Sequence, residues 1–132
     1  MLNATLMTAI GLLFALVVFA GADNALADAR LAKTQTGVAV YYHDRYHGRR
    51  TANGEVYDKQ AMTAAHMRYP FGTRLRVTNL QNQKSVVVRV NDRGPYSRRF
   101  ILDLSKRAAS LLGFLRKGTA RVKIEVLEWG TP

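Results

Sequence analysis

Short segments in which apolar and polar residues alternate recur along most of this 132-residue chain, and they constrain its fold more than any other feature. Such runs are typical of strands, and they predict five of them, at residues 38–42, 75–78, 86–90, 100–102 and 120–127. The second and third flank a polar turn and predict a hairpin. One short helix is predicted to begin at Ser105 and to stop at Gly113. This pattern predicts a mostly β fold, a small closed barrel, rather than a layered α/β sheet.

The first 27 residues predict a secretory signal peptide. Residues 6–22 are almost wholly apolar and carry no charged side chain, and the small-x-small sequence Ala25-Leu26-Ala27 follows them. The alternative is an uncleaved membrane anchor, because about 17 apolar residues is close to the shortest length that spans a bilayer. The chain contains no cysteine, so it offers neither a lipidation site nor a disulfide. We therefore expect a periplasmic or secreted protein without a lipid anchor.

Removing 27 residues from 132 leaves 105, enough for one domain. The predicted organisation is a signal peptide at 1–27, a flexible leader at 28–36, a barrel at 37–128 and a tail at 129–132. Residues 28–132 hold 20 Lys and Arg against 8 Asp and Glu, a formal charge of +12. A charge of this size implies a polyanionic partner. For an exported protein, cell-wall polymers, acidic peptides and anionic lipid head groups fit better than nucleic acid.

Two of the nine acidic residues lie in sequence that favours acid–base chemistry. Asp92 belongs to the sequence NDRGP at 91–95, and Asp103 follows eleven residues later, each beside apolar, strand-like sequence. Partial burial can keep such a carboxyl group protonated, whereas Arg93 can keep it ionised, and either state serves chemistry on a sugar bond. The alternative is that Asp92 caps a turn before Gly94-Pro95 and that Asp103 caps the helix that follows.

Eight motifs, ordered along nearly the whole chain after the leader, resemble those of one family. They are GVAVYY at 37–42, HGR at 47–49, TANGE at 51–55, TAAH at 63–66, PFGT at 70–73, VTN at 77–79, NDRGP at 91–95 and DLS at 103–105. With these motifs the chain resembles the barrel domain of the rare lipoprotein A family. The resemblance implies a six-stranded double-psi β-barrel, a fold shared with expansins and barwin-like proteins. It also implies a role on peptidoglycan in wall remodelling and daughter-cell separation.

Ten candidate site residues follow from the motifs. The catalytic candidates are Asp92, Glu55, His66 and Asp103, and the substrate-binding candidates are Tyr42, Asn53, Thr63, Asn91, Arg93 and Tyr96. Asp92 ranks first as the general acid because it lies in the family motif. Asp103 is the rival acid, because its position resembles that of the catalytic aspartate in expansin-like and endoglucanase barrels. We expect Glu55, His66 and both aspartates to share one concave face.

The residue types leave structural alternatives open for several candidates. Glu55 can pair with an arginine at the surface, and His66 can be a core histidine that donates to a backbone carbonyl. Tyrosines can supply sugar-stacking faces, and the chain offers them at positions 41, 42, 46, 57 and 96. If Tyr41 and Tyr42 both lie on one strand, one of them points inward and belongs to the core.

Two functional hypotheses from different classes remain. The first is a lytic transglycosylase that cleaves the bond between N-acetylmuramic acid and N-acetylglucosamine and leaves a 1,6-anhydro-muramic product. In such cleavage the muramic 6-hydroxyl attacks its own anomeric carbon, so one carboxyl group can act as acid and then as base, whereas a hydrolase needs a second carboxylate at a defined distance. The second hypothesis is a non-catalytic, expansin-like module that binds the polysaccharide.

We expect neither a cofactor nor a metal ion. Nucleotide-binding and zincin motifs are missing from the sequence, and the pair His43 and His47 lies in sequence that favours a loop. The expected partners are peptidoglycan glycan strands, together with cell-division or wall-remodelling proteins, and the expected state is a monomer.

The leader gives a first prediction. Because the small-x-small sequence ends at Ala27, amino-terminal sequencing of the exported protein should begin at Asp28. A protein that retains Met1 and stays with the membrane would show that the leader is an anchor.

Overall fold

A computed structural model describes residues 31–131, so the predicted signal peptide at 1–27 lies outside the described residues. The strands are β1 (Thr34–Tyr41), β2 (Thr63–Ala65), β3 (Arg74–Asn79), β4 (Ser85–Asp92), β5 (Leu102–Leu104) and β6 (Ala120–Glu128). The helices are the 3₁₀ turn η1 (Asp44–Tyr46) and α2 (Lys106–Leu112). The strands close into a barrel in the order β1-β5-β2-β4-β3-β6. The predicted mostly β barrel with one short helix is confirmed.

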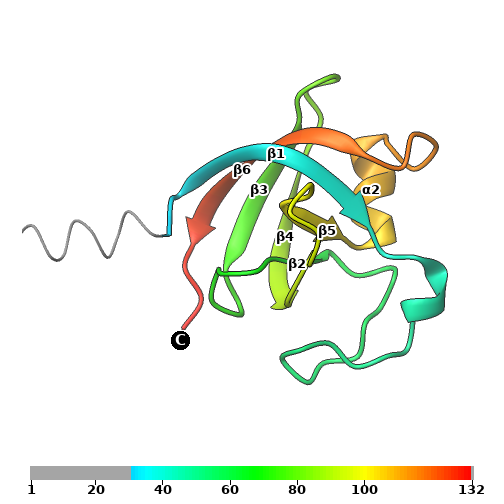
Figure 1. Ribbon diagram of the computed structural model, residues 1–132, viewed down its shortest axis with the longest axis vertical. Coiled ribbons are helices and arrows are strands. Elements are labelled where there is room, and N and C mark those ends of the chain that lie inside the picture. The colour runs from blue at the N-terminus through cyan, green and yellow to red at the C-terminus, as the bar shows by residue number, and fades with distance from the viewer. Residues whose placement is uncertain (1–30, 132) are drawn as a thin grey trace, which may run out of the picture. The chain divides into compact units, whose positions relative to one another are not determined.

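Two parallel pairings bring together segments that are far apart in the sequence. β1 pairs with β5, and β2 pairs with β4, in parallel, whereas the remaining neighbours are antiparallel. Parallel strands need long connections. Figure 1 shows the long segment from the end of β1 to β2, which is part of the chain between the parallel strands β1 and β5, looping out on the same side as α2. This segment reaches the end of β4, where the Ala52 amide donates to Asp92, and the site described below is built there.

The barrel interior is filled by apolar side chains, which alternate along each strand with residues that point outward. Inward-facing residues pair laterally, as Leu75 does with Val88 and Val77 with Ile124, and each of these four is at most 1% exposed. The complete interior set adds Ala39, Ala64, Val90, Leu102, Leu104 and Val122. Alternation therefore predicted both the strands and the face that each buries.

Three strands, β5, β2 and β1, show the main differences from the sequence prediction. β5 runs from Leu102 to Leu104, so the prediction of a strand at 100–102 was wrong by two residues. β2 was not predicted, because Thr63-Ala64-Ala65 is too short and too small to show an apolar period. β1 begins at Thr34, inside the segment predicted to be a flexible leader, since Thr34–Thr36 pair with residues 123–125 of β6. In each case pairing with distant strands sets the boundary, and a local pattern does not record it.

Helix α2 has the ends that its sequence predicts. The Ser105 side chain accepts a hydrogen bond from the Ala108 amide, and Gly113 ends the helix in the left-handed conformation at φ 80°. Its buried face packs against β4 and β1. Asn79 donates from its side chain to the Leu112 carbonyl at 2.9 Å, which ties β3 to the helix. Within residues 31–131, no helix has the length and apolar character needed to cross a membrane.

The buried layer gives a stability prediction. Leu104 is 0% exposed inside the barrel, so Leu104→Ala should lower the free energy of unfolding by about 2 to 5 kcal/mol. Leu127, which is 44% exposed on β6, is the matched control, and Leu127→Ala should change it by less than about 0.5 kcal/mol. Urea unfolding followed by circular dichroism measures both, and equal losses would contradict the assigned core.

Candidate active site

Asp92 and Asp103 lie in one lateral row of the barrel, on either side of a small residue. Ala65 of β2 pairs with Asp103 of β5 on one side and with Asp92 of β4 on the other. Laterally paired residues point to the same face of a sheet. Because Leu104, Ala64 and Val90 form the neighbouring inward row, both aspartates face outward.

A β-bulge sets the orientation of Asp92. The register between β2 and β4 shifts after Ala64, which pairs with Val90, so that Ala65 pairs with Asp92 and Asn91 is the extra residue. Regular alternation would turn Asp92 to the same face as Val90, into the barrel interior. The bulge instead places Asp92 beside Asp103, which is a common use of bulges next to active sites.

Asp92 is held by donors on both carboxylate oxygens. The Tyr42 hydroxyl donates to Oδ2, while the backbone amides of Ala52 and Arg93 donate to Oδ1 at 2.8 and 2.9 Å. Three donors therefore hold this carboxyl group in one orientation. The Arg93 amide bond is the local turn contact expected from the NDRGP motif, but the Tyr42 and Ala52 bonds are long-range and fix the group in the site.

Asp103 has the opposite environment. Its Oδ1 is buried and has no hydrogen-bond partner among the described residues. Burial, and secondly the negative charge of Asp92, raise the pKa of this carboxyl group to about 7. The alternative that Asp103 caps the helix is wrong, because the Ser105 hydroxyl makes that bond. The row therefore joins Asp92, which accepts three hydrogen bonds, to Asp103, which can carry a proton near neutral pH.

Glu55 is locked in a network on the segment that leads to β2. Arg89 of β4 donates to its two oxygens at 2.6 and 2.7 Å, and the side-chain amides of Asn53 and Asn91 donate at 2.9 and 3.2 Å. Chiefly because of the Arg89 bonds, the pKa of Glu55 is lowered to about 2. Glu55 thus pairs with an arginine, as the alternative for this residue predicted. Asn91 connects this network to β4 beside Asp92. Its side chain donates to Glu55, and its carbonyl accepts a hydrogen bond from the Asn53 amide.

The His66 ring is directed away from the two aspartates. It stacks on the Tyr69 ring, with 3.8 Å between the ring centres. Its Nδ1 accepts hydrogen bonds from the backbone amides of Arg68 and Tyr69, and its Nε2 lies 2.9 Å from the Gln35 side-chain oxygen. The ring is therefore neutral with the proton on Nε2, and it accepts from backbone amides rather than donating to a carbonyl. Burial, together with the charge of Arg93, lowers its pKa to about 4. Only the backbone of His66 touches the site, through its amide bond to the Asp92 carbonyl at 3.2 Å.

The predicted binding residues divide into buried and exposed groups. Thr63 and Asn91 are 5% and 2% exposed, and each has one buried side-chain oxygen without a partner among the described residues. Arg93 is occupied, because its guanidinium donates to the His66 and Tyr69 carbonyls and lies 3.9 Å from the Phe71 ring centre. Tyr96 is 80% exposed.

The tyrosines take roles that the sequence could not separate. Tyr42 packs on Tyr57 at 4.4 Å and edge-on to Tyr46 at 5.9 Å, and burial raises the pKa of both Tyr42 and Tyr57. Tyr57 is only 2% exposed, so the expectation that it offers a sugar-stacking face is wrong. Neither Tyr41 nor Tyr42 is a fully buried core residue, since both are half-buried. Tyr41 donates to the Leu115 carbonyl instead of facing the aspartates.

Sequence reasoning missed Arg89, the partner of Glu55. A signal was present, because an arginine interrupts the apolar run Val86-Val87-Val88-Arg89-Val90 at an outward-facing position. The segment that it pairs with could not be read from that run. Within residues 31–131, no three His, Asp or Glu side chains gather in a way that could hold a metal ion.

Two solved structures share this fold. The Streptomyces papain inhibitor aligns with a TM-score of 0.60 and 23% identity, over 74% of this chain and 96% of its own. An expansin from Clavibacter michiganensis aligns with a TM-score of 0.58 and 21% identity, over 75% of this chain and 52% of its own. Likeness at such identity concerns the fold alone. The fold and its outward carboxylate row define a small double-psi β-barrel domain.

Sequence comparison identifies the family. Residues 34–124 match the family model described as lytic transglycolase, so the chain belongs to that family. A relative from Neisseria meningitidis, named endolytic peptidoglycan transglycosylase RlpA, is 58% identical over 92 residues, which are 70% of this chain and 38% of the relative. A relative of the same name from Pseudomonas aeruginosa is 52% identical over 101 residues, 76% of this chain and 29% of its own. The chain thus spans less than two fifths of the length of these relatives.

The carboxylate row predicts an unusual titration. In carboxyl-carbon NMR, Asp103 should titrate near pH 7, far above its ordinary value of 3.8. Asp92→Asn should lower the Asp103 midpoint, because it removes a neighbouring negative charge. A midpoint near 4 in the unmodified protein would contradict the geometry described here.

The same shift predicts how stability depends on pH. A carboxyl group whose pKa is raised by folding contributes most to stability below about pH 3.8 and loses that contribution as the pH rises to about 7. The Asp103→Asn variant should therefore become more stable, relative to the unmodified protein, as the pH rises from about 3.8 to about 7. Asp58→Asn, at an exposed position, is the control and should show no such trend.

Proposed function

We propose that this protein is an exported lytic transglycosylase that cleaves peptidoglycan glycan strands between N-acetylmuramic acid and N-acetylglucosamine. The observation that carries the proposal is the lateral row in which Asp92, with hydrogen-bond donors on both oxygens, and Asp103, with a pKa raised to about 7, flank Ala65. Family membership and the names of the relatives support the same activity. Two adjacent carboxyl groups in opposite protonation states are the usual arrangement for acid–base chemistry on a glycosidic bond.

Asp103 acts as the general acid. It gives its proton to the glycosidic oxygen as the bond from that oxygen to the anomeric carbon breaks. The muramic 6-hydroxyl oxygen bonds to the same carbon, and its proton passes to Asp92, so the product ends in 1,6-anhydro-muramic acid. This assignment reverses the ranking from the motif, because Asp92 already accepts three hydrogen bonds whereas burial raises the pKa of Asp103 to about 7.

Glu55 and His66 act by positioning rather than by proton transfer. A carboxyl group with a pKa of about 2 and four donors holds no proton to give at neutral pH. It fixes Asn53 and Asn91 beside the Ala52 amide that binds Asp92. Both ring nitrogens of His66 are already engaged.

The substrate contacts come from the same outward face. Thr63 and Asn91 are buried, so they support the outward face from beneath instead of contacting the sugar. The exposed ring of Tyr96 and the half-buried ring of Tyr46 supply stacking faces. The basic surface attracts an acidic polymer.

A peptidoglycan substrate requires work outside the cytoplasm, and the apolar leader fits export to the periplasm or beyond the cell. Without a cysteine, the chain cannot carry a lipid on a thiol. We infer a monomer that works with wall-remodelling or cell-division proteins.

Asp103→Asn should lower kcat by roughly two to four orders of magnitude, the usual contribution of a positioned acid, while glycan binding stays within about threefold. Because Asp103 must carry a proton, the activity of the unmodified protein should decline as the pH rises through about 7. Mass spectrometry of the products from peptide-free glycan measures both effects and identifies the anhydro end.

Asp92→Asn should also reduce turnover, and Asp58→Asn, at an exposed position, should leave it unchanged. Products with reducing ends would show a hydrolase. Bound glycan without any product would show the alternative function, an expansin-like binding module.

A further inference from the structure

Arg89 lies on the same outward face of β4 as Asp92, three residues before it. Val90 points into the barrel, so its neighbour Arg89 points outward, and the bulge at Asn91 turns Asp92 to the same side. Arg89 is half-buried and has no part in the proton transfers proposed above. A guanidinium and a carboxylate thus stand close together along one face of the strand.

The turn at residues 51–55 is attached to β4 at both of these points. At one end, the Arg89 guanidinium donates to both carboxylate oxygens of Glu55, at 2.6 and 2.7 Å. At the other end, the Ala52 amide donates to Asp92 Oδ1 at 2.8 Å. The turn therefore lies across the bulge, and one of its own backbone amides is the donor that reaches Asp92.

Hydrogen bonds within the turn couple the position of Glu55 to that of Ala52. The Asn53 side chain donates to the Glu55 carboxylate at 2.9 Å and accepts from the Thr51 hydroxyl at 2.7 Å. The Thr51 amide donates to the Glu55 carbonyl at 2.7 Å. Because the residues on both sides of Ala52 are fixed in this way, the direction of its amide depends on where Glu55 is held.

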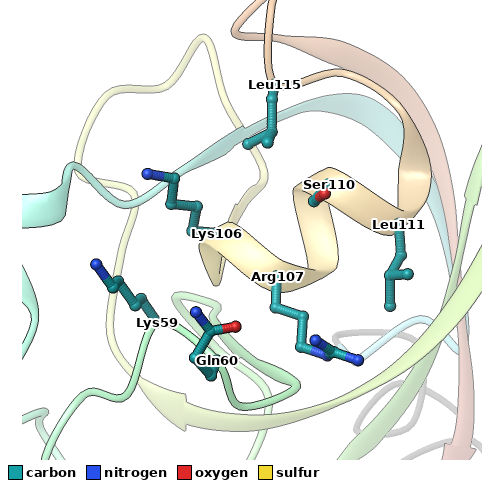
Figure 2. A pocket seen from close by; sticks show the side chains of 7 residues that line it. All are labelled: Lys59, Gln60, Lys106, Arg107, Ser110, Leu111 and Leu115. Carbon is teal, nitrogen blue, oxygen red and sulfur yellow. The ribbon is translucent and has the colours of Figure 1, made fainter.

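A separate set of contacts holds the later part of the same connection. The Arg107 amide donates to the Lys59 carbonyl at 3.0 Å, and Figure 2 shows Lys59 beside the start of α2. The Lys106 amide donates to the Tyr57 hydroxyl at 3.1 Å. Neither bond involves Arg89. Loss of the Arg89 side chain should therefore loosen the turn without releasing the whole connection.

We propose that Arg89 is a positioning residue for the carboxylate row, an inference that rests on the proposed function. Arg89 holds Glu55, Glu55 holds the turn, and the turn directs the Ala52 amide at Asp92. The forked guanidinium binds both carboxylate oxygens at once, which the ammonium group of a lysine does not do in the same geometry. Arg89 acts through these contacts rather than on the sugar, so its loss should lower turnover more than glycan binding.

Amide NMR of the whole protein tests this arrangement without any turnover. In Arg89→Gln the Ala52 amide proton should move upfield and exchange with solvent at least about tenfold faster, because its charged acceptor is no longer held in line. The melting temperature should stay within about 4 °C, since a half-exposed ion pair contributes little to stability.

Arg74→Gln is the matched control. Arg74 pairs laterally with Arg89 on the neighbouring strand β3, and its ion pair with Glu128 is exposed and spans 3.9 Å. This variant removes a cation from the adjacent position and should leave the Ala52 signal, kcat and KM unchanged. An unchanged Ala52 amide in Arg89→Gln, or an equal change in Arg74→Gln, would overturn the proposal.

Turnover of peptide-free glycan gives the second test. Arg89→Gln should lower kcat by about 10- to 100-fold, the cost of slightly misplacing a reacting group, while KM stays within about threefold. Arg89→Lys keeps the charge but not the fork, and its kcat should also fall. Full turnover in Arg89→Lys, or a raised KM with unchanged kcat in Arg89→Gln, would contradict a positioning role.

A double variant tests whether the two side chains act as one unit. Arg89→Gln combined with Glu55→Gln should lose no more turnover than the larger of the two single losses, because each variant breaks the same link. Single losses that multiply would overturn the proposal. An unmodified protein that cleaves no glycan would overturn the proposed function, whereas the Ala52 amide would still show whether Arg89 directs it.

Discussion

The site depends on the lateral row in which Ala65 separates Asp92 from Asp103. Only a small residue separates the two carboxyl groups, and the negative charge of Asp92 contributes to the raised pKa of Asp103. A larger side chain at this position would cover one of them. The row exists because the barrel is closed, since β2 is paired on both edges and carries an aspartate-bearing strand on each side.

The two aspartates differ because different chain segments cover them. Asp92 receives donors from Tyr42 and from the Ala52 amide, both on the long connection between β1 and β2. Asp103 is buried without a partner for its Oδ1 among the described residues. The connection is therefore part of the chemistry, and the Glu55–Arg89 pair anchors it to β4. Such an ion pair contributes little to stability where it is partly exposed, but it fixes geometry.

The long connection between β1 and β2 is also attached to α2. The Tyr57 ring packs on Tyr42, and its hydroxyl accepts a hydrogen bond from the Lys106 amide. One buried tyrosine thus links the carboxylate row to the first residue of α2.

The sequence by itself determined the barrel, the helix ends at Ser105 and Gly113 and most strand positions, because alternation and capping are local properties. Its motifs also predicted both aspartates as site residues. Only the tertiary structure decided that β2 exists, that the bulge turns Asp92 outward and that Arg89 meets Glu55. It also showed that burial raises the pKa of Asp103. These features depend on pairing and burial between segments far apart in the chain, and neighbouring residues in the sequence hold no record of them.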